Sequence, residues 1–241
     1  MNLSFEALLI LGVLGFYLYD SAILVFSNEL IFVESYGRWS VSLPSARWRV
    51  MGKLLFFPNP LTADNLIFRT AWSTADNSSN PELEDMSKLL APMSYLRILV
   101  MVLMVLLAIV LPFVMFRLGM GVDFLKVLFL IYFTIINMLC YTYIKRANLG
   151  LDKKAFASLA FDAIACPPFA INFLRKISLR HVLCKNPVEF AAKKLEPEDF
   201  KRFVEELKKK LSEELECEDE ESSPRSIELT KYREKLMGML P

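Results

Sequence analysis

The residues of this chain that could take part in chemistry gather late in the sequence. His181 stands three residues before Cys184, so the two side chains share a face if this segment is helical. A Cys–His nucleophile also needs a lowered thiol pKa and an orienting group, and neither is evident in the sequence. His181 is the only histidine, whereas a metal site needs three or four ligands. We therefore expect an interfacial His181, a small apolar Cys184, and no catalytic, cofactor or metal site.

A second interpretation of this region is a site for lipid headgroups at the membrane interface. Basic side chains cluster just before His181, and such clusters bind anionic phosphates. A lipid-handling protein or membrane enzyme would use Asp162, Arg175, Lys176, Arg180, His181 and Cys184.

Composition adds no catalytic signal. The chain has 241 residues, a net charge of +1 and a hydrophobic fraction of 54%, with a mean hydropathy of +0.37. Glycine-rich phosphate loops, a GxSxG elbow, an HExxH pair and a Walker lysine are absent from the sequence. The four cysteines contain no CxxC spacing, and we expect reduced thiols.

The elements that must position these residues are membrane helices. Residues 98–116 carry no charged or polar side chain, and a hydrocarbon core about 30 Å thick needs roughly 20 apolar residues. Residues 124–144 form a second apolar run, after a reversal at Gly119 and Gly121. A soluble helix would show an apolar stripe instead of apolar residues all round. The sequence predicts a transmembrane hairpin over residues 96–146.

An earlier apolar run predicts a third span over residues 1–27. The first six residues lack Lys and Arg, which argues against a signal peptide. Asp20 interrupts this span, and ionisable residues within spans are functional candidates. We predict that Asp20 positions the helix or supports assembly by pairing with a basic residue of a neighbouring span or of the following segment.

The distribution of Lys and Arg predicts the orientation. The segment between the first two spans and everything after residue 144 are rich in basic residues, whereas the turn at residues 117–123 has only Arg117. The N-terminus is therefore expected outside and the C-terminus in the cytoplasm. A bacterial inner membrane is the expected host, and a eukaryotic membrane stays as the alternative.

Residues 28–73 predict a small strand-rich cytoplasmic domain. Polar and apolar residues alternate in residues 39–43 and 47–50, and turn signals separate four or five short strands. Residues 74–95 are polar and predict a linker, with a short helix over residues 81–90 as the alternative for its second part. The Trp and Arg residues of the domain fit a protein core with a solvated face, a lipid interface, or, least, nucleic acid. If the domain binds lipid, the residues at the interface would be Trp39, Arg47, Trp48 and Arg49.

Residues 147–185 predict interfacial amphipathic helices. The Pro167–Pro168 pair breaks the apolar run, and basic residues flank it. We therefore expect two short helices at the interface, with a re-entrant loop as the alternative to them.

Residues 186–241 predict a helical cytoplasmic tail with an acidic linker. Two amphipathic helices there either pack on the strand-rich domain or bind a protein partner. The residues for partner binding are Phe200, Phe203, Leu207, Leu211, Leu229 and Leu236.

Together these features predict an α+β integral membrane protein with three transmembrane helices. We expect a membrane-anchored assembly or adaptor subunit without catalysis of its own. Its expected partners are a bilayer with anionic lipid headgroups and either another protein or a second copy of the chain. Nucleic acid and cofactors are not expected.

Overall fold

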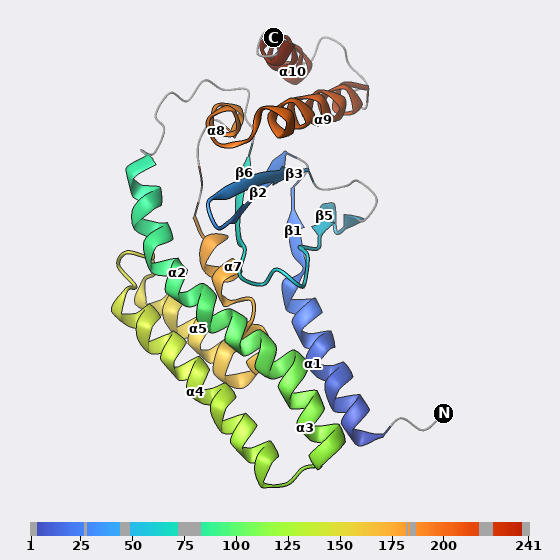
Figure 1. The fold of residues 1–241 in the computed structure, drawn as a ribbon. Coiled ribbons are helices and arrows are strands. Elements are labelled where there is room, and N and C mark those ends of the chain that lie inside the picture. Colours follow the sequence, from blue (N-terminus) through green and yellow to red (C-terminus); the bar gives the residue numbers. More distant parts are fainter. Residues whose placement is uncertain are drawn as a thin grey trace. The chain divides into compact units, whose positions relative to one another are not determined.

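The computed structural model describes residues 4–26, 28–43, 49–71, 83–181, 183, 187–216 and 224–237. The chain is mixed helix and strand, and it forms two compact units (Figure 1). The helical unit combines Met1–Ile23, Phe56–Leu66 and Glu82–His181, and the sheet unit combines Leu24–Leu55, Ile67–Pro81 and Val182–Pro241. Each unit is therefore assembled from three segments that are distant in the sequence.

Long helices form most of the helical unit. Helix α1 (Phe5–Ser21) begins after Ser4, whose Oγ accepts a hydrogen bond from the Ala7 amide and so caps the first turn. Helix α2 (Leu83–Val105) continues through one π-helical turn (Leu106–Val110) into α3 (Leu111–Leu118). The predicted linker at residues 74–95 is thus helical from Leu83 onward, and residues 74–82 lie outside the described part.

The π-helical turn directly precedes a proline. Pro112 has no N–H to donate, so the regular hydrogen-bond ladder is interrupted at this point. The Leu111 amide donates to the Leu106 carbonyl, five residues back, which is the π-helical pattern. The helix thereby continues past the proline without ending.

Within the described part of the chain, two helices are long and apolar enough to cross a membrane. They are Met86–Leu118, with 33 residues, and α4 (Val122–Ile144), with 23 residues. The two helices pack side by side, and the Tyr95 and Tyr141 rings lie 4.6 Å apart between centroids. Helix α1 has 17 residues and packs on α3 and α6.

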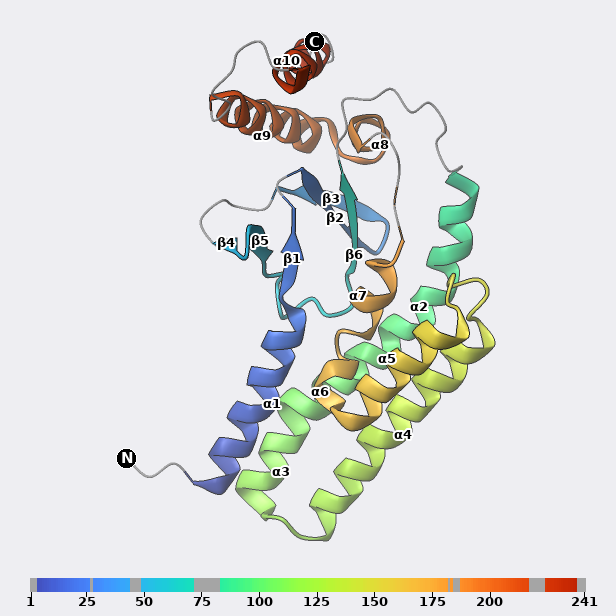
Figure 2. The same ribbon diagram turned by 180° about the vertical axis from the view of Figure 1, so that it is seen from behind.

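Three short helices follow the hairpin and fold back on it. They are α5 (Lys153–Ala165), α6 (Pro167–Ala170) and α7 (Phe173–Ser178). The break before Pro167 confirms that this apolar run is not one helix. Helix α5 runs beside α4, α6 reaches α1, and α7 turns back along α2 (Figure 2). The Phe169 ring on α6 meets the Phe16 ring on α1 edge to face at 6.2 Å.

The sheet unit holds two three-stranded sheets. Their orders are β1-β5-β4 and β3-β2-β6. The strands are β1 (Ile23–Val25), β2 (Glu29–Ser35), β3 (Arg38–Ser42), β4 (Arg49–Val50), β5 (Lys53–Phe56) and β6 (Leu66–Ala71). The strands expected within residues 30–72 are therefore present. Strand β1 was not expected, because its apolar residues continue the apolar run of α1.

Two tight hairpins connect antiparallel strands. Tyr36 and Gly37 join β2 to β3, and Met51 and Gly52 join β4 to β5. All four residues have positive φ: 48° and 87° in the first turn, 50° and 78° in the second. Two-residue turns with positive φ at both positions match the twist of the strands, but they favour Asn or Gly over large side chains.

Helices α8 (Pro187–Lys194) and α9 (Pro197–Glu216) pack on β3, and α10 (Pro224–Met237) packs on α9. Aromatic rings fill the space between the helices and the sheet. The rings of Phe32 and Phe190 lie 5.3 Å apart, and those of Trp39 and Phe190 lie 5.1 Å apart. This aromatic cluster is the core of the sheet unit.

Candidate functional site

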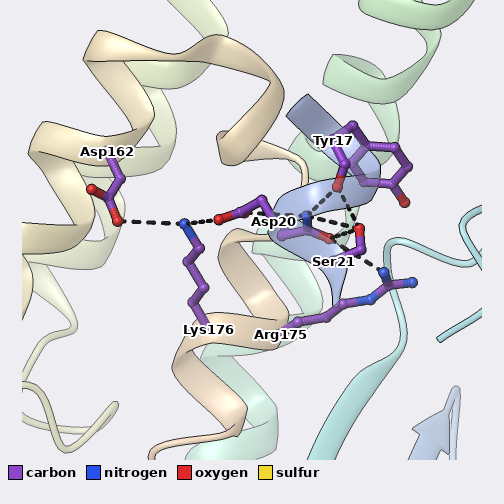
Figure 3. Close-up of polar contacts among 7 residues, drawn as sticks. Tyr17, Asp20, Ser21, Asp162, Arg175 and Lys176 are labelled. Atoms are coloured by element: carbon purple, nitrogen blue, oxygen red, sulfur yellow. Dashed lines mark hydrogen bonds and ion pairs between the residues drawn. The ribbon is translucent and has the colours of Figure 1, made fainter. Parts of the chain in front are cut away.

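The helical unit contains a buried network of polar side chains around the last turn of α1. Figure 3 shows Tyr17, Asp20 and Ser21 from α1 facing side chains of α5 and α7. Such groups lose hydration when buried, so they must find partners within the protein. We call this arrangement the α1 network; its members are Tyr17, Asp20, Ser21, Asp162, Asn172, Arg175 and Lys176.

Asn172 is the centre of the α1 network. It lies between α6 and α7 and is fully buried. Its Nδ2 group donates to the Tyr17 carbonyl at 3.3 Å and to Asp20 Oδ2 at 3.2 Å. Its amide also exchanges hydrogen bonds with the Ser21 hydroxyl, at 3.0 and 3.1 Å. One amide side chain thus holds the end of α1 through both its backbone and its side chains.

Lys176 joins three helices. Its ammonium group lies 2.8 Å from Asp20 Oδ1 on α1 and 3.4 Å from Asp162 Oδ2 on α5. The same group lies 4.9 Å from the centroid of the Phe169 ring, a distance suited to a cation–π contact. Asp20 therefore has a basic partner, but that partner comes from α7 and not from a neighbouring span or from residues 28–73, where the sequence analysis expected it.

Arg175 fixes the loop of residues 57–65, which covers this end of the unit. Its side chain is only 2% exposed. Nη2 donates to the carbonyls of Asn59 at 2.8 Å and Thr62 at 2.6 Å, while Nη1 donates to Asn172 Oδ1 at 3.2 Å. The Tyr17 hydroxyl donates to the Pro60 carbonyl of the same loop. The loop is thus bound by side chains of α1 and α7.

The electrostatics of Arg175 follow from its burial. Burial lowers the pKa of Arg175, and the negative charge of nearby Asp64 acts in the opposite direction. The guanidinium stays charged at neutral pH, because its ordinary pKa is very high. Its hydrogen bonds to carbonyls compensate part of the lost hydration.

His181 and Cys166 lie at the edges of this region. His181 Nε2 is 3.0 Å from the Leu149 carbonyl, which can only accept, so Nε2 carries the proton. Its ring also lies against Gly150. Burial raises the pKa of the Cys166 thiol, which opposes a role as a nucleophile.

The candidates for lipid binding have different positions. Arg175 and Lys176 are engaged in the α1 network, and Arg180 is exposed. Trp39 is 9% exposed and packs on Phe68 and Phe190, so it belongs to the core and not to an interface. Cys184, Arg47, Trp48 and the side chain of Arg49 lie outside the described residues.

The faces predicted to bind a partner are occupied within the sheet unit. Phe203, Leu207 and Leu211 are buried on α9, which packs on β3, α8 and α10, and the Phe203 ring lies 6.5 Å from the Phe32 ring between centroids. Leu229 of α10 is also buried. The alternative of packing on the strand-rich domain therefore holds for α9. Phe200 is half-buried, and the side chain of Leu236 lies outside the described part.

Sequence reasoning found four members of the α1 network, Asp20, Asp162, Arg175 and Lys176, but missed Tyr17, Ser21 and Asn172. A signal for Asn172 was present, because it is a lone amide inside the apolar run of residues 167–174. Among the described residues, no group of three or more His, Cys, Asp and Glu side chains is placed to hold a metal ion. The network can bind helices together, and its polar groups are largely used in doing so.

Comparison with protein-family models, with curated proteins and with solved structures found no match to this chain.

Proposed function

We propose that this chain is a three-span membrane protein that serves as an assembly or adaptor subunit. In this proposal α1, the continuous helix α2–α3, and α4 cross the bilayer. The α1 network anchors them to the fold, and the sheet unit is presented to a protein partner.

The apolar exposed faces of the hairpin carry the membrane proposal. Ile98, Ile109 and Phe113 are among the exposed residues of the first long helix, and Val100 and Leu103 are among its buried ones. Both faces are therefore apolar. A helix that packs on the core of a soluble protein has a polar face toward the solvent. A helix surrounded by lipid instead carries apolar side chains on every face.

Helix α1 supports the same proposal. Phe5, Leu8 and Leu11 are exposed, and only Tyr17 and Ser21 are buried along the helix. Its 17 residues reach about 26 Å at 1.5 Å per residue, close to the thickness of a hydrocarbon core. With the expected orientation, the α1 network lies at the cytoplasmic side of the bilayer, and α5–α7 lie at its interface.

The use of polar groups favours an adaptor over an enzyme. A catalytic group must have a free atom facing a substrate. In the α1 network, Lys176 is held by two carboxylates and Arg175 by two backbone carbonyls. The alternative of a lipid-handling site needs these same cations for headgroups, so we favour the assembly role.

Purification of the tagged full-length protein in mild detergent tests this proposal. Native mass should exceed that of one chain, and a second protein should co-purify in fixed ratio. A single unaccompanied chain in every mild detergent contradicts an adaptor role.

A pair of charge-reversed variants locates the contact. Reversing Glu205 and Lys209 on the exposed face of α9 should release the partner. The matched control reverses Asp123 and Lys126, an exposed ion pair in the helical unit, and should retain it. Equal retention in both variants would remove α9 from the partner-binding surface.

A further inference from the structure

The sheet β1-β5-β4 leaves one of its faces apolar and uncovered among the described residues. Val25 and Leu54 are buried on one side of this sheet. On the other side Leu24, Phe26 and Val50 are each between 41% and 49% exposed, and Met51 at the hairpin tip is 98% exposed. We call Leu24, Phe26, Val50 and Met51 the apolar sheet face.

Strand geometry places these residues together. Successive side chains alternate across a strand, so Leu24 and Phe26 share a face. Val50 pairs directly with Lys53 in the antiparallel register, and Lys53 Nζ lies 4.6 Å from the Phe26 ring centroid. Lys53 of β5 therefore has Val50 of β4 and Phe26, the residue after β1, on its own side of the sheet.

The hairpin tip presents its apolar side chain at a conformational cost. Met51 adopts φ of 50°, in the left-handed region that disfavours large side chains. Turn geometry alone would favour Asn here, and solubility alone would favour a polar residue. Met51 is therefore an apolar side chain that stands almost fully exposed at the end of the apolar sheet face.

Charge indicates what covers this face. Between Glu34 and Asp64 the sequence has no acidic residue, and it has four basic ones: Arg38, Arg47, Arg49 and Lys53. Of these, Lys53 lies on the apolar sheet face beside the Phe26 ring, whereas Arg38 belongs to β3 of the other sheet. Apolar side chains with a lysine at their edge, in a stretch of sequence without acidic residues, favour the interface of a bilayer with anionic headgroups. A protein partner of matching shape would not require this absence of acidic residues.

Chain continuity restricts the distance to the bilayer. Leu24 follows Ser21, the last residue of α1, by three residues, so the two are at most about 10 Å apart along an extended chain. If α1 ends at the membrane surface, the apolar sheet face starts there as well. We infer that the apolar sheet face inserts into the bilayer interface, with Met51 as its tip; this inference rests on the proposed span of α1.

Tryptophan quenching by brominated lipids tests the inference on the full-length protein. The variants Met51→Trp, Tyr36→Trp and Leu11→Trp are reconstituted separately into vesicles of brominated phosphatidylcholine and phosphatidylglycerol. The native tryptophans are common to all, so the difference from wild type reports the added residue. Tyr36 is the matched control, because it occupies the same position of an equivalent turn on the other sheet and is 69% exposed.

Quenching should be strong at position 51, strong at position 11 inside α1, and weak at position 36. In vesicles of phosphatidylcholine alone, quenching should decrease at 51 and stay constant at 11. If quenching is equally weak at positions 51 and 36 but strong at position 11, the inference is overturned. The proposed span of α1 would then still hold, and the result would point to a protein partner on the apolar sheet face. Unchanged quenching at 51 in neutral vesicles would overturn the role of anionic lipid.

The result at position 11 tests the proposed span separately. Weak quenching there contradicts the span of α1, while the result at 51 still decides whether the sheet face meets lipid. If Met51→Trp does not fold, Leu24→Trp reports on the same face and has the same expected result.

Discussion

Lys176 of α7 and Asp20 of α1 form an ion pair of 2.8 Å in a largely buried setting. The two side chains are 22% and 13% exposed, compared with 71% and 54% for the ion pair of Lys126 and Asp123. These are a sheltered and an exposed pair of the same chemical type. This difference in burial makes the energetic role of Lys176 measurable.

Replacing Lys176 by Met should destabilise the protein, because it leaves the Asp20 carboxylate without its cation. We expect a loss of about 2–3 kcal/mol, toward the lower end of values for broken buried pairs. The control Lys126→Met should cost about 0–1 kcal/mol, as exposed pairs do. Thermal unfolding of both variants in detergent provides the comparison. Equal losses would show that Lys176 contributes no more than a surface lysine.

Replacing Arg175 by Lys should loosen the loop of residues 57–65. Lysine keeps the charge but lacks the planar fork that reaches the Asn59 and Thr62 carbonyls together. Each lost bond of this charged type costs about 1.5–3 kcal/mol. Hydrogen exchange of loop amides should accelerate in this variant and stay unchanged in the exposed control Arg180→Lys. Unchanged exchange in both would contradict the anchoring role.

Replacing Gly150 by Ala should be destabilising for two reasons. Gly150 has φ of 57°, and an added Cβ would lie 2.6 Å from Cε1 of His181. The left-handed conformation alone costs about 1–2 kcal/mol for a residue with a Cβ. Adding His181→Ala should recover only part of the loss, because it removes the overlap and not the strain. Gly121→Ala meets no atom within 4 Å and should be mild, and an equally mild Gly150→Ala would contradict the prediction.

The Cys166 thiol should react slowly at neutral pH. Burial raises its folded-state pKa above the ordinary thiol value, so alkylation by iodoacetamide should accelerate only at higher pH than for free glutathione. The associated stability is fully present below the unfolded-state pKa of the thiol. It is lost as pH rises through the higher folded-state pKa, because the unfolded chain then releases the proton first. Mass spectrometry of the peptide that carries Cys166 measures the rate, and a profile matching glutathione would be the contrary result.

Local patterns predicted most of the elements and few of the long-range contacts. The strand positions followed from alternation and turn residues, and the end of α5 followed from Pro167 and Pro168. Asp20 stood out because a carboxylate in an apolar run needs a partner. The sequence did not identify Lys176 as the partner of Asp20, because several basic residues met the same description.

Other contacts had no sequence signal at all. The acceptors of Arg175 are backbone carbonyls, and every residue carries one. For Trp39, the sequence favoured a core over an interface without deciding between them, and the positions of Phe68 and Phe190 place it in the core. The faces of α9 and α10 show the same ambiguity, since an amphipathic helix looks alike whether it covers its own sheet or a partner.

The contacts of Asn172 also bear on the order of synthesis. Ser21 and Asn172 are 151 residues apart in the sequence. At translation rates of about 5–20 residues per second, α1 leaves the ribosome roughly 8–30 s before Asn172 and Lys176 exist. During that interval Ser21 has the Tyr17 carbonyl of its own helix as an acceptor, but the Asp20 carboxylate lacks Asn172 and Lys176. Helix α1 is therefore made long before the residues that complete its final contacts.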